Sequence, residues 1–207
     1  GIIPNLEFPT LFRQYFLMFG PFVLLLVPYL LLEAARGGKR MNWRLGIQGA
    51  VGLLIALVTL VVLLVLAASV VPALRDTVLR FVAERGGFGQ VIPVVLLRRL
   101  SHSVLTVLLL ATLALILARL VPRRNPDNAD EADMDTRTVS ELANLPYSIA
   151  TGFTLLLVAS AVGLTLVPEF VYLRDNFGVR INTIFKFYYQ AWVMFAIASA
   201  YAVHNFL

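Results

Sequence analysis

The chain has 207 residues, of which 59% are hydrophobic and 14% are charged, and its formal net charge is +5. A soluble domain carries roughly 25% charged residues, so this composition excludes an ordinary soluble protein and indicates an integral membrane protein. The positive charge suits anionic lipid headgroups, nucleic acid is not expected as a partner, and the absence of cysteine excludes disulfides and thiolate metal sites.

Five uncharged stretches are each long enough to cross a membrane, because a hydrocarbon core of about 30 Å takes roughly 20 apolar residues in a helix. They predict transmembrane helices at about residues 14–32, 45–71, 100–120, 147–167 and 182–207, the third beginning at Pro93 or Leu100. The stretch from Val51 to Val71 is apolar almost throughout and lacks the alternation of a barrel strand. The predicted fold class is therefore all-α: a polytopic membrane helix bundle with about five transmembrane helices, in a single domain covering residues 1–207.

The connections between these helices differ in character. Residues 1–12 read as a loop broken by Pro4 and Pro9, and residues 33–44 form a short basic loop. Between residues 72 and 99, apolar residues recur at helical spacing opposite charged ones, which predicts one interfacial amphipathic helix ending at Gly86-Gly87. Residues 121–146 hold six of the twelve acidic residues and predict a mobile polar loop.

The basic loop at residues 33–44 has the densest group of Arg and Lys beside membrane ends, so we place it in the cytoplasm. Residues 1–12, 72–99 and 168–186 then share the outer face, and we expect the protein in the plasma membrane. The chain opens with Gly1 and stops at Leu207 within an apolar helix. We therefore expect it to be a fragment of a longer polypeptide, whose upstream part is its partner.

The most informative stretch is residues 168–192, where charged side chains alternate with aromatic ones. It holds two acids, Glu169 and Asp175, and three bases, Arg174, Arg180 and Lys186. Asn182, Lys186 and Gln190 are four residues apart with Tyr189 beside them, so they form one polar stripe on the last helix. Such a stripe is costly against lipid, and we expect it to face the bundle interior or a watery cavity.

Two interpretations of this stretch remain open. In the functional one, Arg180 and Lys186 hold a phosphate near the start of the last helix, and Asp175 or Glu169 acts as base or metal ligand. In the structural one, the bases reach toward lipid headgroups, the acids pair with them, and the aromatic residues form an interfacial belt.

Secondary candidates lie elsewhere on the same face. Arg98, Arg99 and His102 cluster at the start of the third membrane helix and could join an anion site, although a basic helix end is more often a lipid anchor. Asn5 and Glu7, in the opening loop, are further candidates. The two histidines of the chain have no acidic partner at ligand spacing, so no metal or cofactor is assigned from the sequence.

The run RINTIFKFYYQAW at residues 180–192, preceded by PEFVYLRDNFG, resembles the signature of the YYY family of highly hydrophobic membrane proteins, also called the Chlor_Arch_YYY domain. The opening GIIPNLEFPTLFRQYFLMFGPF is also similar to a segment of that family. The resemblance covers most of the chain, as the carboxy-terminal part of a longer protein. The intervening helices match only in hydrophobicity.

The resemblance implies a GT-C-type membrane glycosyltransferase, which transfers a sugar from a polyprenyl-phosphate donor on the outer face. It implies that Arg180 and Lys186 bind the lipid-linked phosphate and that Glu169 and Asp175 line the same cavity. Such enzymes carry their key acidic residue in the first outer loop, a region outside this chain. The alternative is a non-enzymatic membrane protein, either transporter-like or an assembly subunit, in which the polar stripe serves packing or a substrate path.

Overall fold

The computed structural model describes residues 2–84, 86–123, 146–173 and 180–207, which are mostly helical. The long helices are α1 (Phe12–Gly37), α2 (Trp43–Val70), α5 (Val104–Leu120), α7 (Ile149–Leu166) and α8 (Ile181–Phe206). The shorter elements are β1 (Ile2–Pro4), the 3-10 turns η1 (Gly38–Arg40) and η3 (Val167–Glu169), α3 (Pro72–Ala83), α4 (Phe88–Ser101) and β2 (Val171–Leu173).

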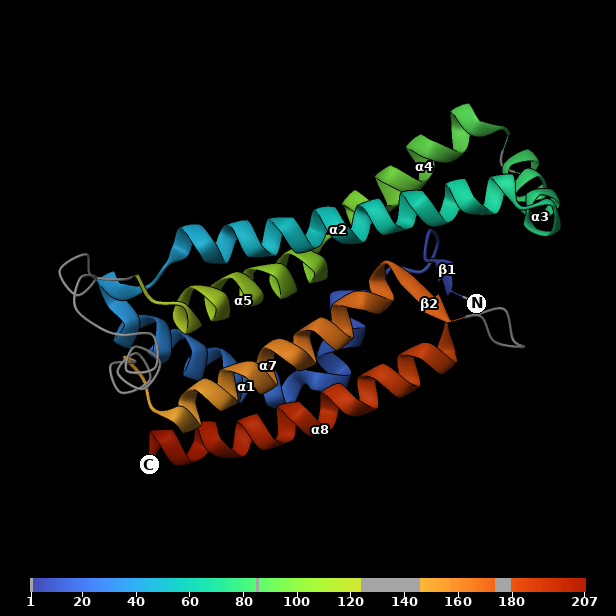
Figure 1. Cartoon of the computed structure of the whole chain (residues 1–207). Coiled ribbons are helices and arrows are strands. Elements are labelled where there is room, and N and C mark those ends of the chain that lie inside the picture. Colours follow the sequence, from blue (N-terminus) through green and yellow to red (C-terminus); the bar gives the residue numbers. More distant parts are fainter. Residues whose placement is uncertain (1, 85, 124–145, 174–179) are drawn as a thin grey trace.

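The long helices lie side by side in one bundle (Figure 1). Helix α2 packs on α5, α7 packs on α8, and α1 contacts both α5 and α8. The predicted all-α membrane helix bundle is confirmed, and each predicted membrane helix coincides with a long helix of the bundle.

Within the described part of the chain, three helices are long and apolar enough to cross a membrane: α1, α2 and α7, the first and last counted with the turns that follow them. A fourth span results if α4 and α5, which meet at an angle of 61°, count as one broken helix. Helix α8 is as long as α1. It is not among these spans, because Lys186, several tyrosines and amides lower its hydropathy.

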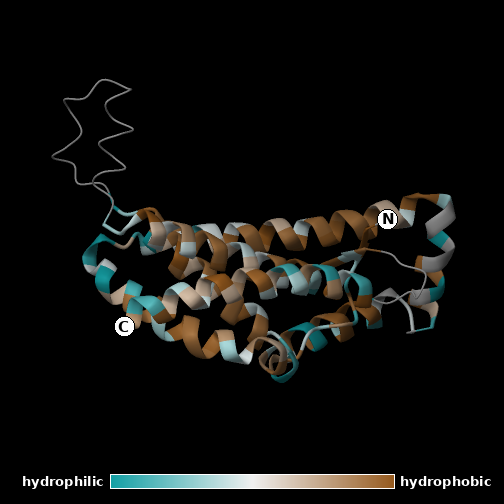
Figure 2. Cartoon of the chain, turned by 90° about the horizontal axis from the view of Figure 1, so that it is seen from below, coloured by the Kyte–Doolittle hydropathy of each residue, from teal (hydrophilic) through white to brown (hydrophobic). Residues whose placement is uncertain are grey.

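Apolar side chains fill the core and also cover the outside of the bundle. Phe19 of α1 is fully buried and meets Tyr188 and Phe195 of α8 edge to face, with ring centroids 5.3 and 5.5 Å apart. Leu17 and Ile149 are largely exposed, and Figure 2 shows hydrophobic residues along most of the length of the helices. An apolar exterior of this kind is suited to lipid rather than water.

Two connections differ from their predictions. Residues 2–4 are not loop, because β1 pairs antiparallel with β2 in the register Ile2↔Leu173, Ile3↔Tyr172 and Pro4↔Val171. The stretch before α5 contains two helices: α3 lies where the amphipathic helix was predicted, and α4 follows after Gly86 and Gly87, which both adopt positive φ. Most of the predicted mobile loop, residues 124–145, lies outside the described residues.

The contact between α2 and α5 is close because small residues face each other. A Cβ atom added at Gly46 would lie 2.1 Å from the carbonyl oxygen of Ala114 and 2.9 Å from Cβ of Ala118. Since backbone atoms of a packed helix cannot yield as a side chain does, the helices would have to separate.

We therefore expect Gly46→Ala to destabilise the protein by about 1–3 kcal/mol, the usual cost of overpacking. Gly52→Ala in the same helix is the matched control, since a Cβ atom there meets nothing within 4 Å. SDS titration of the detergent-solubilised protein, followed by tryptophan fluorescence, measures both variants. Equal stability of the two would contradict this account of the α2–α5 contact.

Candidate functional site

The candidate site lies at the end of the bundle where the opening segment meets residues 168–173 and the start of α8. The β1–β2 pairing draws together segments far apart in sequence, and the backbone N–H of Asn5 extends it by donating to the carbonyl of Phe170 over 2.8 Å. Residues 2–12, helices α3 and α4, residues 168–173 and the start of α8 thus share one end of the bundle, as their alternation along the chain predicted.

Asn5 fastens the opening segment to this end. Its buried side-chain amide donates to the carbonyls of Pro168, over 2.9 Å, and Phe8, over 3.1 Å, while its Oδ1 accepts the N–H of Phe8 over 3.0 Å. The guanidinium of Arg99 donates to the Asn5 carbonyl and lies over the Phe170 ring, 5.3 Å from its centroid. Asn5 and Arg99 therefore hold the site together.

Glu169 and Arg180 form a buried ion pair close to these contacts, with 3.1 Å between Arg180 Nη1 and Glu169 Oε1. Their exposed fractions are 2% and 9%. Thr10 completes the group: its backbone N–H donates to Glu169 Oε2 over 2.9 Å, its hydroxyl donates to Glu169 Oε1, and that hydroxyl accepts from Arg180 Nη2 over 2.9 Å. Both carboxylate oxygens are thus engaged, and the guanidinium is held in one orientation.

Arg180 also borders an open pocket of about 480 Å³. The pocket is lined by Glu7, Phe8, Pro9, Leu11, Gln14, Arg98, His102, Arg180, Ile181 and Ile184. The lining combines two arginines, a histidine and a glutamate with apolar side chains. A phosphate attached to a hydrocarbon chain suits this combination, because guanidinium binds phosphate oxygens and apolar side chains can accept the hydrocarbon.

The break between α4 and α5 supplies part of this pocket. Serine side chains at the break bond to carbonyls of the last turn of α4: Ser101 Oγ donates to Arg98 O over 3.0 Å, and Ser103 Oγ donates to Leu100 O over 2.8 Å. His102 Nδ1 lies 2.9 Å from the same Arg98 oxygen. Interrupted membrane helices often line substrate sites, and this one brings Arg98 and His102 to the pocket.

The structure brings together most of the predicted site residues, although they come from three separate segments. Arg180, Arg98, His102 and Glu7 line the pocket, while Glu169 lies directly behind Arg180. Arg174 and Asp175 lie outside the described residues.

The prediction that the polar stripe of α8 faces the bundle interior or a cavity is wrong for the described part of the chain. Asn182, Lys186, Tyr189 and Gln190 are exposed, and none of them lines the pocket. The interior face of α8 instead carries Ala191, Ala198 and Ala202, all fully buried with Phe195. Small residues allow α7 and α8 to approach closely, and this packing sets the rotation of the helix.

Thr10 was missed by sequence reasoning, although it bonds to both members of the buried pair. No sequence motif identifies Thr10 as part of the site. It follows Pro9 and lies 159 residues from Glu169 in the chain. Its role is a consequence of the β1–β2 pairing, which the sequence did not predict.

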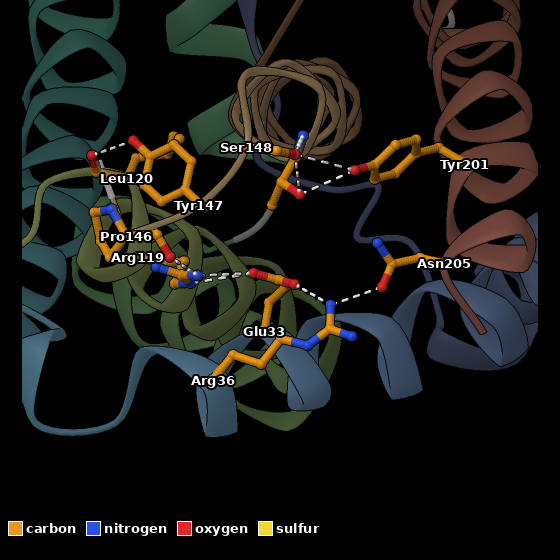
Figure 3. A network of polar contacts seen from close by, with 10 residues as sticks. Glu33, Arg36, Arg119, Leu120, Pro146, Tyr147, Ser148, Tyr201 and Asn205 are labelled. Carbon is orange, nitrogen blue, oxygen red and sulfur yellow. Dashed lines mark hydrogen bonds and ion pairs between the residues drawn. The ribbon is translucent and has the colours of Figure 1, made fainter. Parts of the chain in front are cut away.

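A second polar network lies at the opposite end of the bundle (Figure 3). Arg119 of α5 donates from Nε and Nη2 to Glu33 Oε2 of α1, over 3.2 and 3.0 Å, and both side chains are 2% exposed. Arg36 donates to Glu33 Oε1 over 2.8 Å and to Asn205 of α8 over 2.6 Å. This network joins α1, α5 and α8 and was also missed, because Glu33 and Arg119 read as the boundaries of membrane spans.

Tyr147 connects the network to the start of α7. The Arg119 guanidinium lies 4.9 Å from the centroid of its ring, and its hydroxyl donates to Leu120 O over 2.7 Å. Burial raises the pKa of the Tyr147 hydroxyl, with Arg119 acting in the opposite direction, so the hydroxyl stays a neutral donor. The contacts of this network join helices to one another, and we regard the network as structural.

Among the described residues, no group of three or more His, Asp or Glu side chains is placed to hold a metal ion. No curated protein and no solved structure matches the chain. A family of uncharacterised membrane proteins does match, over residues 2–195, which include both polar networks except Asn205. The chain therefore belongs to the DUF2298 family of uncharacterised membrane proteins.

Proposed function

We propose that the pocket binds the phosphate of an anionic membrane lipid and that the chain is the lipid-binding part of a glycosyltransferase. The observation that carries the proposal is the convergence of Arg98, His102 and Arg180 on one open pocket with an apolar wall. Guanidinium groups are well suited to phosphate oxygens, and the pocket lies at one end of membrane helices, where a lipid headgroup would be found.

The resemblance to the YYY family supplies the identity of the lipid in this proposal, a polyprenyl-phosphate-linked sugar at the outer face of the plasma membrane. In the transfer reaction, the bond between the sugar and the phosphate oxygen breaks and an acceptor hydroxyl forms the new bond. The lipid phosphate leaves with the bonding electrons, so the cations of the pocket stabilise the charge that develops on it.

Glu169 has a different role here from the one that its sequence position predicted. Because both of its oxygens are engaged by Thr10 and Arg180, we propose that it orients Arg180 rather than removing a proton from the acceptor. Among the described residues, Glu7 supplies the carboxylate that lines the pocket. Asp175 is the candidate for the base.

A second candidate function is an assembly or transporter-like subunit, and the exposed stripe of α8 favours it. Lys186 and Gln190 lie on the surface of a helix that packs within a membrane bundle. Polar side chains at such a position are costly against lipid unless another protein segment covers them.

The two candidates predict different results for a pair of charge-removing variants. Under the lipid-phosphate proposal, Arg98→Gln weakens binding of farnesyl phosphate about tenfold or more, since a hydrogen bond to a charged group contributes about 1.5–3 kcal/mol. Lys186→Gln removes the same charge outside the pocket and leaves binding unchanged. Microscale thermophoresis of the protein in detergent measures both variants.

Farnesol and inorganic phosphate separate the contributions of chain and phosphate in the same assay. Binding of farnesol as tight as that of farnesyl phosphate would contradict a phosphate site. Equal loss in Arg98→Gln and Lys186→Gln would indicate general charge attraction in place of the pocket. Loss in Lys186→Gln alone would move the site to the α8 stripe.

A further inference from the structure

His102 stands at the break between α4 and α5, where its ring is held by the backbone of its own helix. Nδ1 lies 2.9 Å from the carbonyl oxygen of Arg98 and 2.9 Å from Ser101 Oγ. The hydroxyl of Ser101 lies within hydrogen-bond distance, 3.0 Å, of the same carbonyl oxygen. These contacts fix the imidazole relative to the wall of the pocket that it lines.

The carbonyl contact decides which ring nitrogen carries the proton. A carbonyl oxygen can only accept, so Nδ1 must be the protonated nitrogen that donates to Arg98 O, with Ser101 Oγ as a second acceptor. An unprotonated Nδ1 would set its lone pair against that of the carbonyl at the same distance. In the neutral ring, the proton is therefore on Nδ1, and Nε2 is left with a free lone pair.

Resting on the proposed function, we infer that His102 is the ionisable ligand of the pocket. When the lipid phosphate monoester that sugar transfer releases is bound, Nε2 takes up one proton from solvent and donates it in a hydrogen bond to a phosphate oxygen. Nδ1 keeps its proton in both states, so the ring need not turn between them. His102 thereby selects for a phosphate oxygen that carries full negative charge, as in a monoester, over an uncharged headgroup.

Charged side chains lie on several of the elements next to His102. Arg98 of α4 and Arg180 at the start of α8 line the same pocket, and Arg99 lies behind the opening segment, bonded to Asn5. Glu7 lines the pocket too, while Glu169 is paired with Arg180. These three arginines and two glutamates sum to one positive charge. A bound phosphate monoester adds negative charge beside the ring.

The affinity of the pocket for the lipid phosphate depends on pH, because binding takes up a proton. The bound state holds one proton more than the free state, so the contribution of His102 to affinity is present at acidic pH and lost as the imidazole gives up its proton. The second ionisation of the phosphate, near pH 6, affects affinity in the opposite direction. That ligand effect is the same for every variant of the protein, so a ratio of affinities isolates His102.

The test compares farnesyl phosphate binding to the wild-type chain and to His102→Asn between pH 5.5 and pH 8.5. Asparagine can keep the donor to Arg98 O through its amide but cannot ionise. We expect the wild type to bind about tenfold more tightly than the variant at pH 5.5 and about equally at pH 8.5, given the usual contribution of a charge-assisted hydrogen bond. A ratio that does not change with pH would overturn the inference.

A second measurement reads the tautomer directly. The chain has two histidines, so ¹⁵N-histidine labelling in a His204→Gln background leaves one imidazole in the NMR spectrum. We expect the Nδ1-protonated form at pH 8.5, and Nε2 protonation when farnesyl phosphate is added near pH 7. Observation of the Nε2-protonated neutral form would overturn the inference.

The inference and the proposed function fail in different ways. If the wild type does not bind farnesyl phosphate at any pH, the proposed function fails and the inference fails with it. If binding depends on Arg98 and is indifferent to His102, the inference alone is wrong. Binding of phosphatidic acid in place of farnesyl phosphate would keep the role of His102 and change the lipid that carries the phosphate.

Discussion

Replacing Glu33 with alanine is expected to lower the free energy of unfolding by about 3–5 kcal/mol, the usual cost of removing one partner from a buried ion pair. The reason is that Arg119, which is 2% exposed, would keep its charge without a carboxylate. In the part of the chain that the structure describes, it would be left with the Pro146 carbonyl and the face of the Tyr147 ring. The ion pair between α1 and α5 would be lost with it. SDS titration in dodecyl maltoside micelles measures the change.

Arg36→Ala is the matched control for this network. Arg36 also pairs with Glu33, but its side chain is 46% exposed, and Glu33 keeps Arg119 when Arg36 is removed. We therefore expect at most about 1 kcal/mol. The double replacement Glu33→Leu with Arg119→Leu should recover stability relative to Glu33→Ala, because no buried charge remains unpaired. Equal effects of Glu33→Ala and Arg36→Ala would contradict the buried-pair account.

Replacing Glu169 with alanine should have an effect of the same size at the opposite end, about 3–5 kcal/mol. The variant leaves Arg180 buried without its carboxylate and removes the acceptor of the Thr10 N–H. Thr10 also loses the partner of its hydroxyl, so residues 2–12 lose one of their attachments to the bundle. Thermal unfolding followed by tryptophan fluorescence should show a lower midpoint.

This result separates a positioning role for Glu169 from a catalytic one. A residue that only removed a proton from the acceptor could be replaced with little loss of stability. A stable Glu169→Ala protein that has lost only transfer activity would therefore contradict the assignment made here. Glu169→Leu combined with Arg180→Met is the control, since an apolar pair of similar volume should restore much of the stability.

The candidate site could be predicted in part from the sequence. Arg180 and Glu169 were identified because charged side chains alternate with aromatic ones in the short connection between the last two membrane helices. Arg98, His102 and Glu7 were assigned to the same face by counting spans, since segments separated by an even number of crossings lie on one side. Counting membrane crossings needs no knowledge of distances between residues. The structure confirms that these residues share one end of the bundle.

Lys186 shows where the same reasoning failed. Spacing alone places Asn182, Lys186 and Gln190 on one face of α8, and that geometry is correct. Which way this face points depends on the helix against which α8 packs. The structure buries the face that carries Ala191 and Ala198, so the polar stripe lies on the surface.

By itself, the sequence determined the class of the protein, the positions of its long helices and the end of the bundle at which the site lies. These properties follow from local composition and helical length, because a membrane requires long apolar helices whose backbone bonds are internal. The tertiary structure alone decided the β1–β2 pairing, the partners of Thr10 and Glu33, and the rotation of α8. Each of these is a contact between residues far apart in the chain, and such contacts are selected by packing and by the satisfaction of buried charge, neither of which has a fixed spacing in sequence.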